Sequence, residues 1–261
     1  MDQLTIIKIG GNILDNQSFL DNLLDYFSAL PGKKILVHGG GKIANVLMEQ
    51  LGIKPVMIDG RRITDEKTLE IVTMVYAGLI NKKLVARLQQ RGCDALGLTG
   101  ADANIIPAVK RPVKDIDYGF VGDVYAKDIS SNTINSFLAM GLVPVCAPIT
   151  HNGDGILLNT NADTIASSIA IALAHYYEVN LVYCLEKNGV LMNSEDENSV
   201  ISKIDKKSFN EYVLSGVVSA GMIPKLENAF KAIDSGVKQV TICGPQAFKQ
   251  DNAIVGTVIV C

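Results

Sequence analysis

The stretch Leu4-Thr5-Ile6-Ile7-Lys8-Ile9-Gly10-Gly11 decides the expected fold. Its apolar run predicts a buried β-strand that ends in a glycine turn. A lysine inside such a strand is costly unless another group compensates for its charge. Open α/β sheets bind ligands at the carboxyl ends of their strands, so an anion could contact Lys8 and the amides of both glycines. Alternatively, Lys8 extends its ammonium group into solvent at the strand end. The stretch alone favours neither reading.

Short β-rich runs alternate with longer helical patterns along the rest of the chain. This alternation predicts an α/β protein whose mainly parallel sheet is covered by helices on both faces. The expected strands are 4–9, 35–38, 95–99, 142–149, 181–185, 239–243 and 257–260. The expected helices are 18–30, 42–51, 65–90, 131–140, 162–175, 206–215 and 224–235.

Two stretches break this alternation. Residues 103–129 contain Pro107, Pro112 and a polar run, which is typical of hairpins or of a flap over an active site. Residues 186–202 are rich in Asn, Glu and Ser and predict a surface loop. No flexible linker divides the chain.

Composition limits the function classes. The 261 residues are 48% hydrophobic and carry a net charge of −3, which disfavours a nucleic-acid partner. The five cysteines form no C-x-x-C pair, so a reducing cytoplasm fits better than zinc or disulfides. Met1-Asp2-Gln3 lacks the basic region of a signal peptide, and the longest apolar stretch, 165–177, is too short for a membrane span. We therefore expect a cytoplasmic protein without a membrane partner.

A second glycine turn follows the next expected strand, in Val37-His38-Gly39-Gly40-Gly41-Lys42. Three consecutive glycines let a backbone curl around an anion at a helix N-terminus. The alternative is a tight strand-to-helix turn, for which one glycine would suffice. The spacing matches neither a dinucleotide-binding fingerprint nor a P-loop.

Polar residues in Asn159-Thr160-Asn161-Ala162-Asp163 precede an apolar helical pattern. Asn161 suits the N-cap, and an acidic Asp163 in the first turn suits the helix dipole. On its own, Asp163 is therefore better explained as structural. Asn159 lies outside the cap and has no such explanation.

Gly221-Met222-Ile223-Pro224-Lys225 begins another expected helix, because proline favours a first turn. Lys225 is then a cation in that turn, where the dipole opposes it by roughly 0.3–1 kcal/mol. A bound phosphate would reverse this penalty. An exposed lysine that tolerates the small cost is the alternative.

An arginine pair stands in Gly60-Arg61-Arg62, after another short strand. Arginine can bind a carboxylate through two parallel hydrogen bonds. A solvated basic turn is the simpler reading of the pair alone. The three histidines, at 38, 151 and 175, form no metal-binding pattern.

Taken together, these motifs resemble the amino acid kinase family, and within it the branch that phosphorylates N-acetylglutamate. The resemblance covers essentially the whole chain, and the order of its motifs is more specific than any one of them. The motifs are Lys8-Ile9-Gly10-Gly11, His38-Gly39-Gly40-Gly41, Gly60-Arg61-Arg62, Gly97-Leu98-Thr99-Gly100-Ala101-Asp102, Gly119-Phe120-Val121-Gly122, Asn159-Thr160-Asn161-Ala162-Asp163, Gly221-Met222-Ile223-Pro224-Lys225 and Gly256-Thr257.

The resemblance implies an open αβα sandwich that forms a single domain over 1–261. It places an acyl-amino-acid site in residues 1–178 and an ATP site in residues 179–261. The catalytic residues it implies are Lys8, Lys225 and Asp163. The substrate-binding residues it implies are Gly40, Gly41, Arg62, Asn159 and Asn161. The residues it implies for phosphate and nucleotide are Gly10, Gly11, Glu186, Gly189, Gly221 and Met222.

The implied reaction is ATP-dependent phosphorylation of the γ-carboxylate of N-acetyl-L-glutamate, or of another N-acylglutamate, as a step in arginine biosynthesis. A carboxylate is ionised at neutral pH, so its attack needs no general base. Magnesium would be held mainly by the nucleotide phosphates, without protein ligands. The alternatives are a kinase for glutamate, aspartate, carbamate or UMP, and a non-catalytic ligand sensor.

The acyl group stays open between acetyl and a larger group such as succinyl, and residues around 63–80 and 103–125 are expected to line its pocket. One departure from the family concerns Leu185 and Glu186, where relatives often carry Ser or Thr followed by Asp. Lys8 lies too close to the start for the additional N-terminal helix of arginine-inhibited relatives. We therefore expect a homodimer without arginine feedback.

Overall fold

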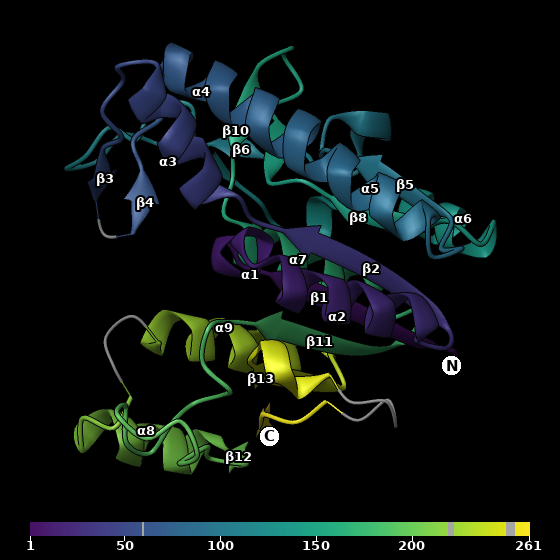
Figure 1. Ribbon diagram of the computed structural model, residues 1–261, viewed down its shortest axis with the longest axis vertical. Coiled ribbons are helices and arrows are strands. Elements are labelled where there is room, and N and C mark those ends of the chain that lie inside the picture. Colours follow the sequence, from purple (N-terminus) through teal and green to yellow (C-terminus); the bar gives the residue numbers. More distant parts are fainter. Residues whose placement is uncertain (59, 219–221, 249–253) are drawn as a thin grey trace.

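A central sheet organises the protein. The computed structural model describes residues 1–58, 60–218, 222–248 and 254–261. Within these residues, eight strands form one sheet in the order β12-β14-β13-β11-β1-β2-β8-β5 (Figure 1). The strands from β13 to β5 in this order are parallel, while β14 is antiparallel to β13. Their bounds are β1 Gln3–Ile9, β2 Lys33–His38, β5 Ala95–Leu98, β8 Val143–Cys146, β11 Glu178–Cys184, β12 Lys203–Ile204, β13 Gln239–Cys243 and β14 Thr257–Ile259.

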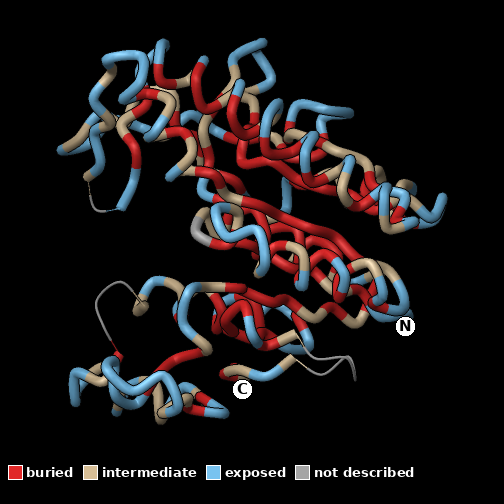
Figure 2. Tube along the Cα trace, viewed as in Figure 1, coloured by how far each residue is buried: buried red, intermediate tan, exposed pale blue. Residues whose placement is uncertain are grey.

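Two hydrophobic layers hold helices on opposite faces of this sheet, as the alternation in β1 requires. Leu4 and Ile6 point into one layer, and Ile7 and Ile9 point into the other, because successive side chains of a strand face opposite ways. Figure 2 shows the buried residues concentrated along the central strands. The first layer contains α6 Ser131–Ala139, α7 Ala162–Leu173 and α9 Ile223–Asp234. The second contains α2 Gln17–Ala29, α3 Gly41–Gln50, α4 Glu66–Thr73, a π-helical segment Met74–Ile80 and α5 Asn81–Gln89.

The mainly parallel αβα sandwich is thus confirmed, and three details differ from the expectation. The stretch 142–149 is not one strand, because β8 ends at Cys146 and β9 Ile149–His151 starts a separate pair with β10 Leu157–Asn159. Pro148 lies between them and lacks the N–H that would continue the ladder.

The other two differences concern helices. The long helix expected over 65–90 contains a π-helical segment in its middle. A short helix, α1 Gly11–Asp15, follows β1 directly. Helix α1 was not expected from the sequence, because it begins with glycine, which is a poor helix former.

Two further short antiparallel strand pairs lie outside the central sheet. β3 Met57–Ile58 pairs with β4 Arg61–Arg62, and β6 Val109–Lys110 pairs with β7 Gly122–Asp123. The second pair confirms the hairpin expected within 103–129. The expected loop over 186–202 contains turns and one bridge, between Leu191 and Val200. It leads through β12 into α8 Lys206–Leu214. None of the helices in the described ranges is long and apolar enough to cross a membrane.

Candidate active site

Two glycine turns face each other where β1 and β2 end. A methyl group added to Gly11 would lie 3.8 Å from the amide nitrogen of Gly41, and one added to Gly39 would lie 3.7 Å from that of Gly11. Helix α3 begins at Gly41, and no side chain caps its first amides. Uncapped amides at a helix N-terminus attract an anion. The two turns therefore form a cradle of backbone donors at the carboxyl edge of the sheet.

Lys8 and Lys225 meet at one carboxylate, although 216 positions separate them in the chain. Lys8 Nζ lies 2.7 Å from Asp163 Oδ1, and Lys225 Nζ lies 2.6 Å from Asp163 Oδ2. The Lys225 contact is an aligned hydrogen bond, whereas the Lys8 contact is an ion pair without that alignment. The side chains of Lys8, Asp163 and Lys225 are 9%, 13% and 30% exposed, so the cluster is largely shielded but open on the Lys225 side.

The charge balance of this cluster favours an anion. Burial raises the pKa of Asp163, but the nearby charges of Lys8 and Lys225 outweigh burial and lower the pKa to about 2. Asp163 is therefore ionised at neutral pH. Two ammonium groups around one carboxylate leave an excess of one positive charge in a shielded place.

One cavity opens from this cluster toward the C-terminal part of the chain. Its lining includes four of the six residues expected at the phosphate and nucleotide, namely Gly10, Gly11, Glu186 and Met222. Gly189 is not among them, because it packs tightly against Thr257, where an added methyl would approach the hydroxyl oxygen to 2.8 Å. Gly221 lies outside the described residues. The full lining is Gly10, Gly11, Ile13, Gly41, Lys42, Leu185, Glu186, Lys187, Met222 and Lys225.

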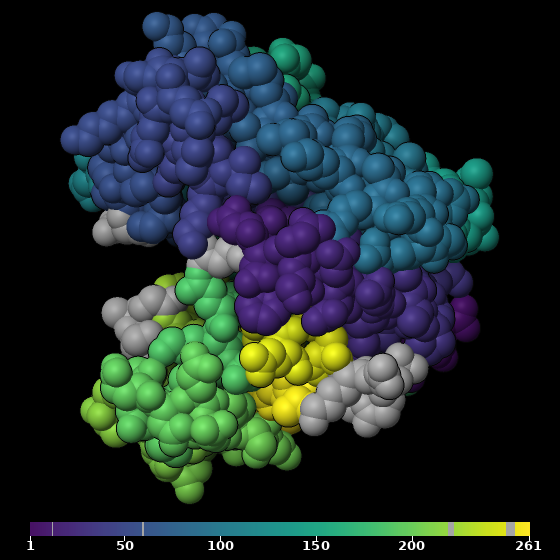
Figure 3. Space-filling model, in the orientation of Figure 1, coloured from purple at the N-terminus to yellow at the C-terminus, as the bar shows by residue number. Residues whose placement is uncertain are grey.

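A second cavity lies on the N-terminal side and contains every residue expected to bind the acyl amino acid. Gly41 lines both cavities, so they meet at the glycine cradle. In the space-filling view the surface is indented between the blue N-terminal part and the green C-terminal part (Figure 3). The second cavity is lined by Gly39, Gly40, Gly41, Met57, Gly60, Arg61, Arg62, Tyr76, Arg111, Val121, Pro148, Asn159, Thr160, Asn161 and Ala162.

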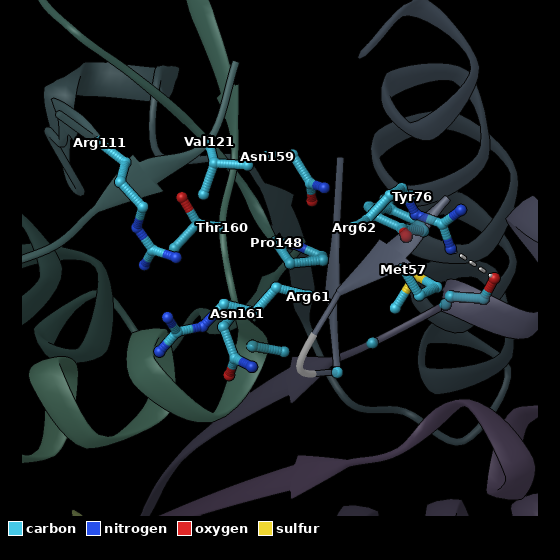
Figure 4. A pocket seen from close by; sticks show the side chains of 15 residues that line it. Met57, Arg61, Arg62, Tyr76, Arg111, Val121, Pro148, Asn159, Thr160 and Asn161 are labelled. Carbon is cyan, nitrogen blue, oxygen red and sulfur yellow. Dashed lines mark hydrogen bonds between the residues drawn. The ribbon is translucent and has the colours of Figure 1, made fainter. Parts of the chain in front are cut away.

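Arg62 is the cation that fixes one end of this second cavity. It is 6% exposed, and it donates to the carbonyl oxygen of Gly41 at 3.1 Å (Figure 4). No carboxylate in the described part of the chain pairs with it. A buried guanidinium without a counter-ion is costly, so this end of the cavity is suited to an anionic ligand.

Thr64 connects two residues that the sequence only suggested as partners. Asn159 Nδ2 donates to Thr64 Oγ1 at 3.0 Å, and Thr64 Oγ1 donates to the carbonyl oxygen of Arg62 at 3.1 Å. Thr64 itself is fully buried. Arg62 and Asn159 are thereby held in a fixed relation. Asn161 caps α7 as expected, accepting from the amides of Asp163 at 2.7 Å and Thr164 at 3.1 Å.

Two further arginines lie on the opposite side of this cavity from Arg62. Figure 4 shows Arg61 near Asn161 and Arg111 near Thr160, whereas Arg62 lies near Tyr76. Arg111 forms an ion pair with Asp123 through Nε and Nη2, and its Nη1 has no hydrogen-bond partner among the described residues. The cavity therefore has a cation at each end.

Sequence reasoning did not single out Tyr76, Arg111 or Thr160 as lining residues. Tyr76 and Arg111 do fall within 63–80 and 103–125, the ranges expected to line the acyl pocket. Arg111 stands in a polar hairpin whose sequence gives no sign of which arginine turns inward. Thr160 could have been found from its place between Asn159 and Asn161.

The structure has no cluster of three or more His, Cys, Asp or Glu residues suited to a metal ion, within the ranges it describes. The only carboxylate of the lysine cluster already contacts both lysines.

The sequence was compared with protein families and with known proteins. The sequence pattern of the amino acid kinase family matches residues 3–244. The acetylglutamate kinase of Phocaeicola vulgatus is 54% identical over 258 residues, which cover 99% of this chain and 98% of that protein. The acetylglutamate kinase of Cytophaga hutchinsonii is 53% identical, with 100% and 99% covered.

Among solved structures, the protein smu.665 from Streptococcus mutans UA159 superposes with a TM-score of 0.79 at 32% identity, covering 98% of both chains. A carbamate kinase from Giardia lamblia bound to AMP-PNP superposes with a TM-score of 0.69 at 13% identity, covering 99% of this chain and 98% of that one. At that identity the likeness concerns the fold alone.

Proposed function

The chain belongs to the amino acid kinase family, and we propose that it transfers the γ-phosphoryl group of ATP to the γ-carboxylate of an N-acyl-L-glutamate. The names of its relatives favour N-acetyl-L-glutamate as that substrate and arginine biosynthesis as its pathway. One observation carries the proposal. Two lysines from opposite ends of the chain contact one shielded carboxylate beside two cavities that share Gly41.

Phosphoryl transfer mainly requires positioning and compensation of spread negative charge. Lys8 and Lys225 would contact the moving group from two sides, and Asp163 would hold both ammonium groups in place. The amides of Gly11, Gly40 and Gly41 would add preorganised hydrogen bonds. The attacking γ-carboxylate is already ionised, so the site needs no base.

The residues of the first cavity suit a nucleoside triphosphate. We assign ATP to residues 179–261 together with the glycine cradle, and the acyl amino acid to residues 1–178. When bound, ATP supplies the phosphoryl group and Mg²⁺ neutralises part of its charge. Because both oxygens of Asp163 contact lysines, Mg²⁺ would be held mainly by the phosphates. Glu186 and Met222 would contact the nucleotide at the rim of the cavity.

The second cavity suits an acylated amino acid. Arg62 would bind the α-carboxylate, since it is buried and has no counter-ion in the described chain. Asn159, oriented by Thr64, would bind beside it. Gly40, Gly41 and Asn161 line the same cavity and would complete the contacts. An N-acyl group removes the ammonium charge that a free amino acid would bring toward this arginine.

A second candidate substrate, N-succinyl-L-glutamate, is favoured by the arginines opposite Arg62. An acetyl group offers no charge to them, whereas a succinyl group ends in a second carboxylate. Arg61 lies in that part of the cavity and forms no ion pair with the described residues, and Arg111 retains an unused donor. Arginine recognises carboxylates well, through a planar fork of donors.

Assembly and compartment are parts of the same proposal. Val46, Met74 and Leu79 are 54%, 57% and 44% exposed on α3 and the π-helical segment. These two elements contact each other, and covering their exposed apolar side chains with a second copy of the chain would bury apolar surface, which supports a homodimer. The described cysteines are free, as expected of a cytoplasmic enzyme. No nucleic-acid or membrane partner is proposed.

The test is ADP release measured with ATP, Mg²⁺ and four acceptors, namely N-acetylglutamate, N-succinylglutamate, glutamate and aspartate. We expect turnover with at least one N-acylglutamate and little with the free amino acids. Turnover of glutamate or aspartate alone would point to another kinase of the family. Binding without turnover would point to a ligand sensor.

The acyl group is tested by Arg111→Gln. If succinyl is the natural group, this change lowers kcat/KM for N-succinylglutamate by about ten-fold, the size of one lost charge-assisted contact, and changes kcat/KM for N-acetylglutamate little. Equal effects on both acceptors would contradict the second candidate.

A further inference from the structure

His38 is a fully buried histidine directly behind the glycine cradle, and the mechanism above does not use it. It ends β2, and its Nδ1 lies 2.8 Å from the carbonyl oxygen of Gly39. Its Nε2 lies 3.2 Å from Asn81 Nδ2. The imidazole therefore bridges the cradle and the start of α5.

These contacts require one protonation state. A carbonyl oxygen only accepts, so Nδ1 carries the hydrogen and donates to Gly39. The amide nitrogen of Asn81 donates, so Nε2 accepts and carries no hydrogen. Burial lowers the pKa of His38 to about 4, although its hydrogen bond to Gly39 opposes the shift, so the ring is neutral at pH 7.

Asn81 is itself held from several sides. Its Nδ2 also donates to the carbonyl oxygen of Val145 in β8, at 2.8 Å, and its Oδ1 accepts from Lys82 Nζ at 3.1 Å. Lys82 in turn donates to the carbonyl oxygen of Gly97 in β5, at 3.1 Å. Asn81 is 1% exposed. The imidazole is thus connected to two neighbouring strands of the sheet.

The π-helical segment that precedes Asn81 covers the same turn. A methyl group added to Gly40 would lie 2.8 Å from Tyr76 Cδ1 and would also collide with Ile80, so only glycine fits. Both side chains come from Met74–Ile80. The wider turn of a π-helix shifts the residues that follow it around the axis, and such bulges occur frequently at functional sites.

Because the peptide bond is planar, the hydrogen bond from His38 to the Gly39 carbonyl also fixes the direction of the Gly40 N–H. The carbonyl of Gly39 and the N–H of Gly40 share one trans peptide plane and point in opposite directions. The hydrogen bond from His38 therefore turns the Gly40 N–H away from the imidazole. Gly40 itself lines the acyl cavity. No described residue accepts a hydrogen bond from this N–H, so it is available to a ligand.

We infer that His38 and Asn81 are positioning residues for phosphoryl transfer, which hold the Gly39–Gly40 peptide so that its amide faces the reacting groups. The inference rests on the proposed function. Preorganised donors contribute most when they need no reorganisation during the reaction. A small displacement of this peptide should therefore lower kcat more than it weakens substrate binding.

Two substitutions separate the two contacts of the imidazole. The amide of Asn reaches about as far as Nδ1 of histidine, and the amide of Gln about as far as Nε2. His38→Asn can keep the donor to Gly39, whereas His38→Gln keeps only the contact with Asn81. We expect His38→Gln to lower kcat about ten-fold or more, with KM for the N-acylglutamate within about three-fold. We expect His38→Asn to retain kcat within about three-fold of wild type.

The matched controls are His175→Asn and His175→Gln, because His175 is exposed beyond the end of α7. They should leave kcat and KM unchanged. Asn81→Ala should lower kcat in the same direction as His38→Gln, and the double variant should lose less than the product of the two single losses. Wild-type kcat in both His38 variants would overturn the inference.

A measurement on the wild-type protein covers the case in which the variants fail to fold. Nitrogen-15 spectra of the histidine rings should show His38 protonated at Nδ1 alone and unchanged between about pH 8 and pH 6, which is about two units above the pKa of this ring. An Nε2–H tautomer, or titration in that range, would overturn the arrangement. If wild-type protein releases no ADP with any N-acylglutamate, the proposed function fails, while the ring spectra still decide the geometry.

Discussion

Asp163 and Asp234 both form ion pairs with lysine at nearly the same distance, but the two sites differ in their exposure to solvent. Asp163 contacts Lys8 at 2.7 Å and Lys225 at 2.6 Å, and its side chain is 13% exposed. Asp234 contacts Lys206 at 2.7 Å, and both side chains are about half exposed, at 51% and 55%. Water screens the second pair, whereas the first cluster is largely shielded and its Lys225 lines the cavity on the C-terminal side. Contact distance alone therefore does not identify a functional ion pair; burial and the unbalanced charge do.

The largest effect is expected from Lys8→Ala, which removes one of the two ammonium groups at Asp163. Removing one preorganised cation from a phosphoryl-transfer site should cost about 3 kcal/mol or more of transition-state stabilisation, which is a loss of at least about 100-fold in kcat. Steady-state kinetics with the preferred N-acylglutamate measure it. Lys206→Ala is the matched control and should leave kcat unchanged. Full activity of Lys8→Ala would reject the proposed mechanism.

Asp163→Asn tests the carboxylate itself. The change keeps the shape of the side chain but leaves two ammonium groups together without a counter-ion, in a partly shielded place. We expect the free energy of unfolding to fall by about 2–3 kcal/mol, somewhat less than for a fully buried pair, and kcat to fall as well. Urea unfolding measures the first quantity. If Asp234→Asn destabilises the protein as much, the distinction between the two sites is wrong.

The stabilisation that Asp163 contributes depends on pH. The pKa of Asp163 falls to about 2 on folding from an ordinary value of 3.8. Its stabilisation is therefore fully present above about pH 4 and is lost as the pH falls through the folded value, amounting to about 2 kcal/mol at neutral pH. The stability difference between wild type and Asp163→Asn should shrink by about 1 kcal/mol between about pH 5 and pH 3. A constant difference over this range would show that Asp163 is not held by its lysines.

The smallest effect is expected at the exposed pair. Lys206→Met removes its ion pair with Asp234, and the free energy of unfolding should change by about 0.5 kcal/mol or less. The remaining effect should weaken further in high salt. A loss of more than about 1 kcal/mol would mean that exposure is a poor guide to the value of these contacts.

Much of the fold could be predicted because periodicity and glycine report directly on strands and their ends. The run around Lys8 marks the central strand, and the alternation of Ile6 with Ile7 already implies two covered faces. The break between β8 and β9 could have been read from Pro148, which cannot donate to a ladder. The π-helical segment could not, since its seven residues resemble ordinary helix.

Some residues of the candidate site could likewise be predicted from the sequence, and others could not. Lys8, Gly11 and Gly41 follow strands, so a parallel sheet must bring them to one edge. Their convergence with Asp163 needed the resemblance to a family, because its own sequence context favours an ordinary helix start. Arg111, Tyr76 and Thr64 depend on how hairpins and the long helix close over the sheet, which no local pattern specifies. Gly189, which the resemblance placed at the nucleotide, packs closely against Thr257 of β14, a contact that its local sequence does not indicate.

We propose that Lys8 and Lys225 act on one migrating phosphoryl group. The most direct test is a crystal structure of the protein with ADP, aluminium fluoride, Mg²⁺ and its preferred N-acylglutamate, in which the fluoride mimics that group. We predict both lysine ammonium groups within hydrogen-bond distance of the same fluoride, with Asp163 between them. A fluoride that contacts neither lysine, or only one of them while the other remains on the far side of the cavity, would contradict the account.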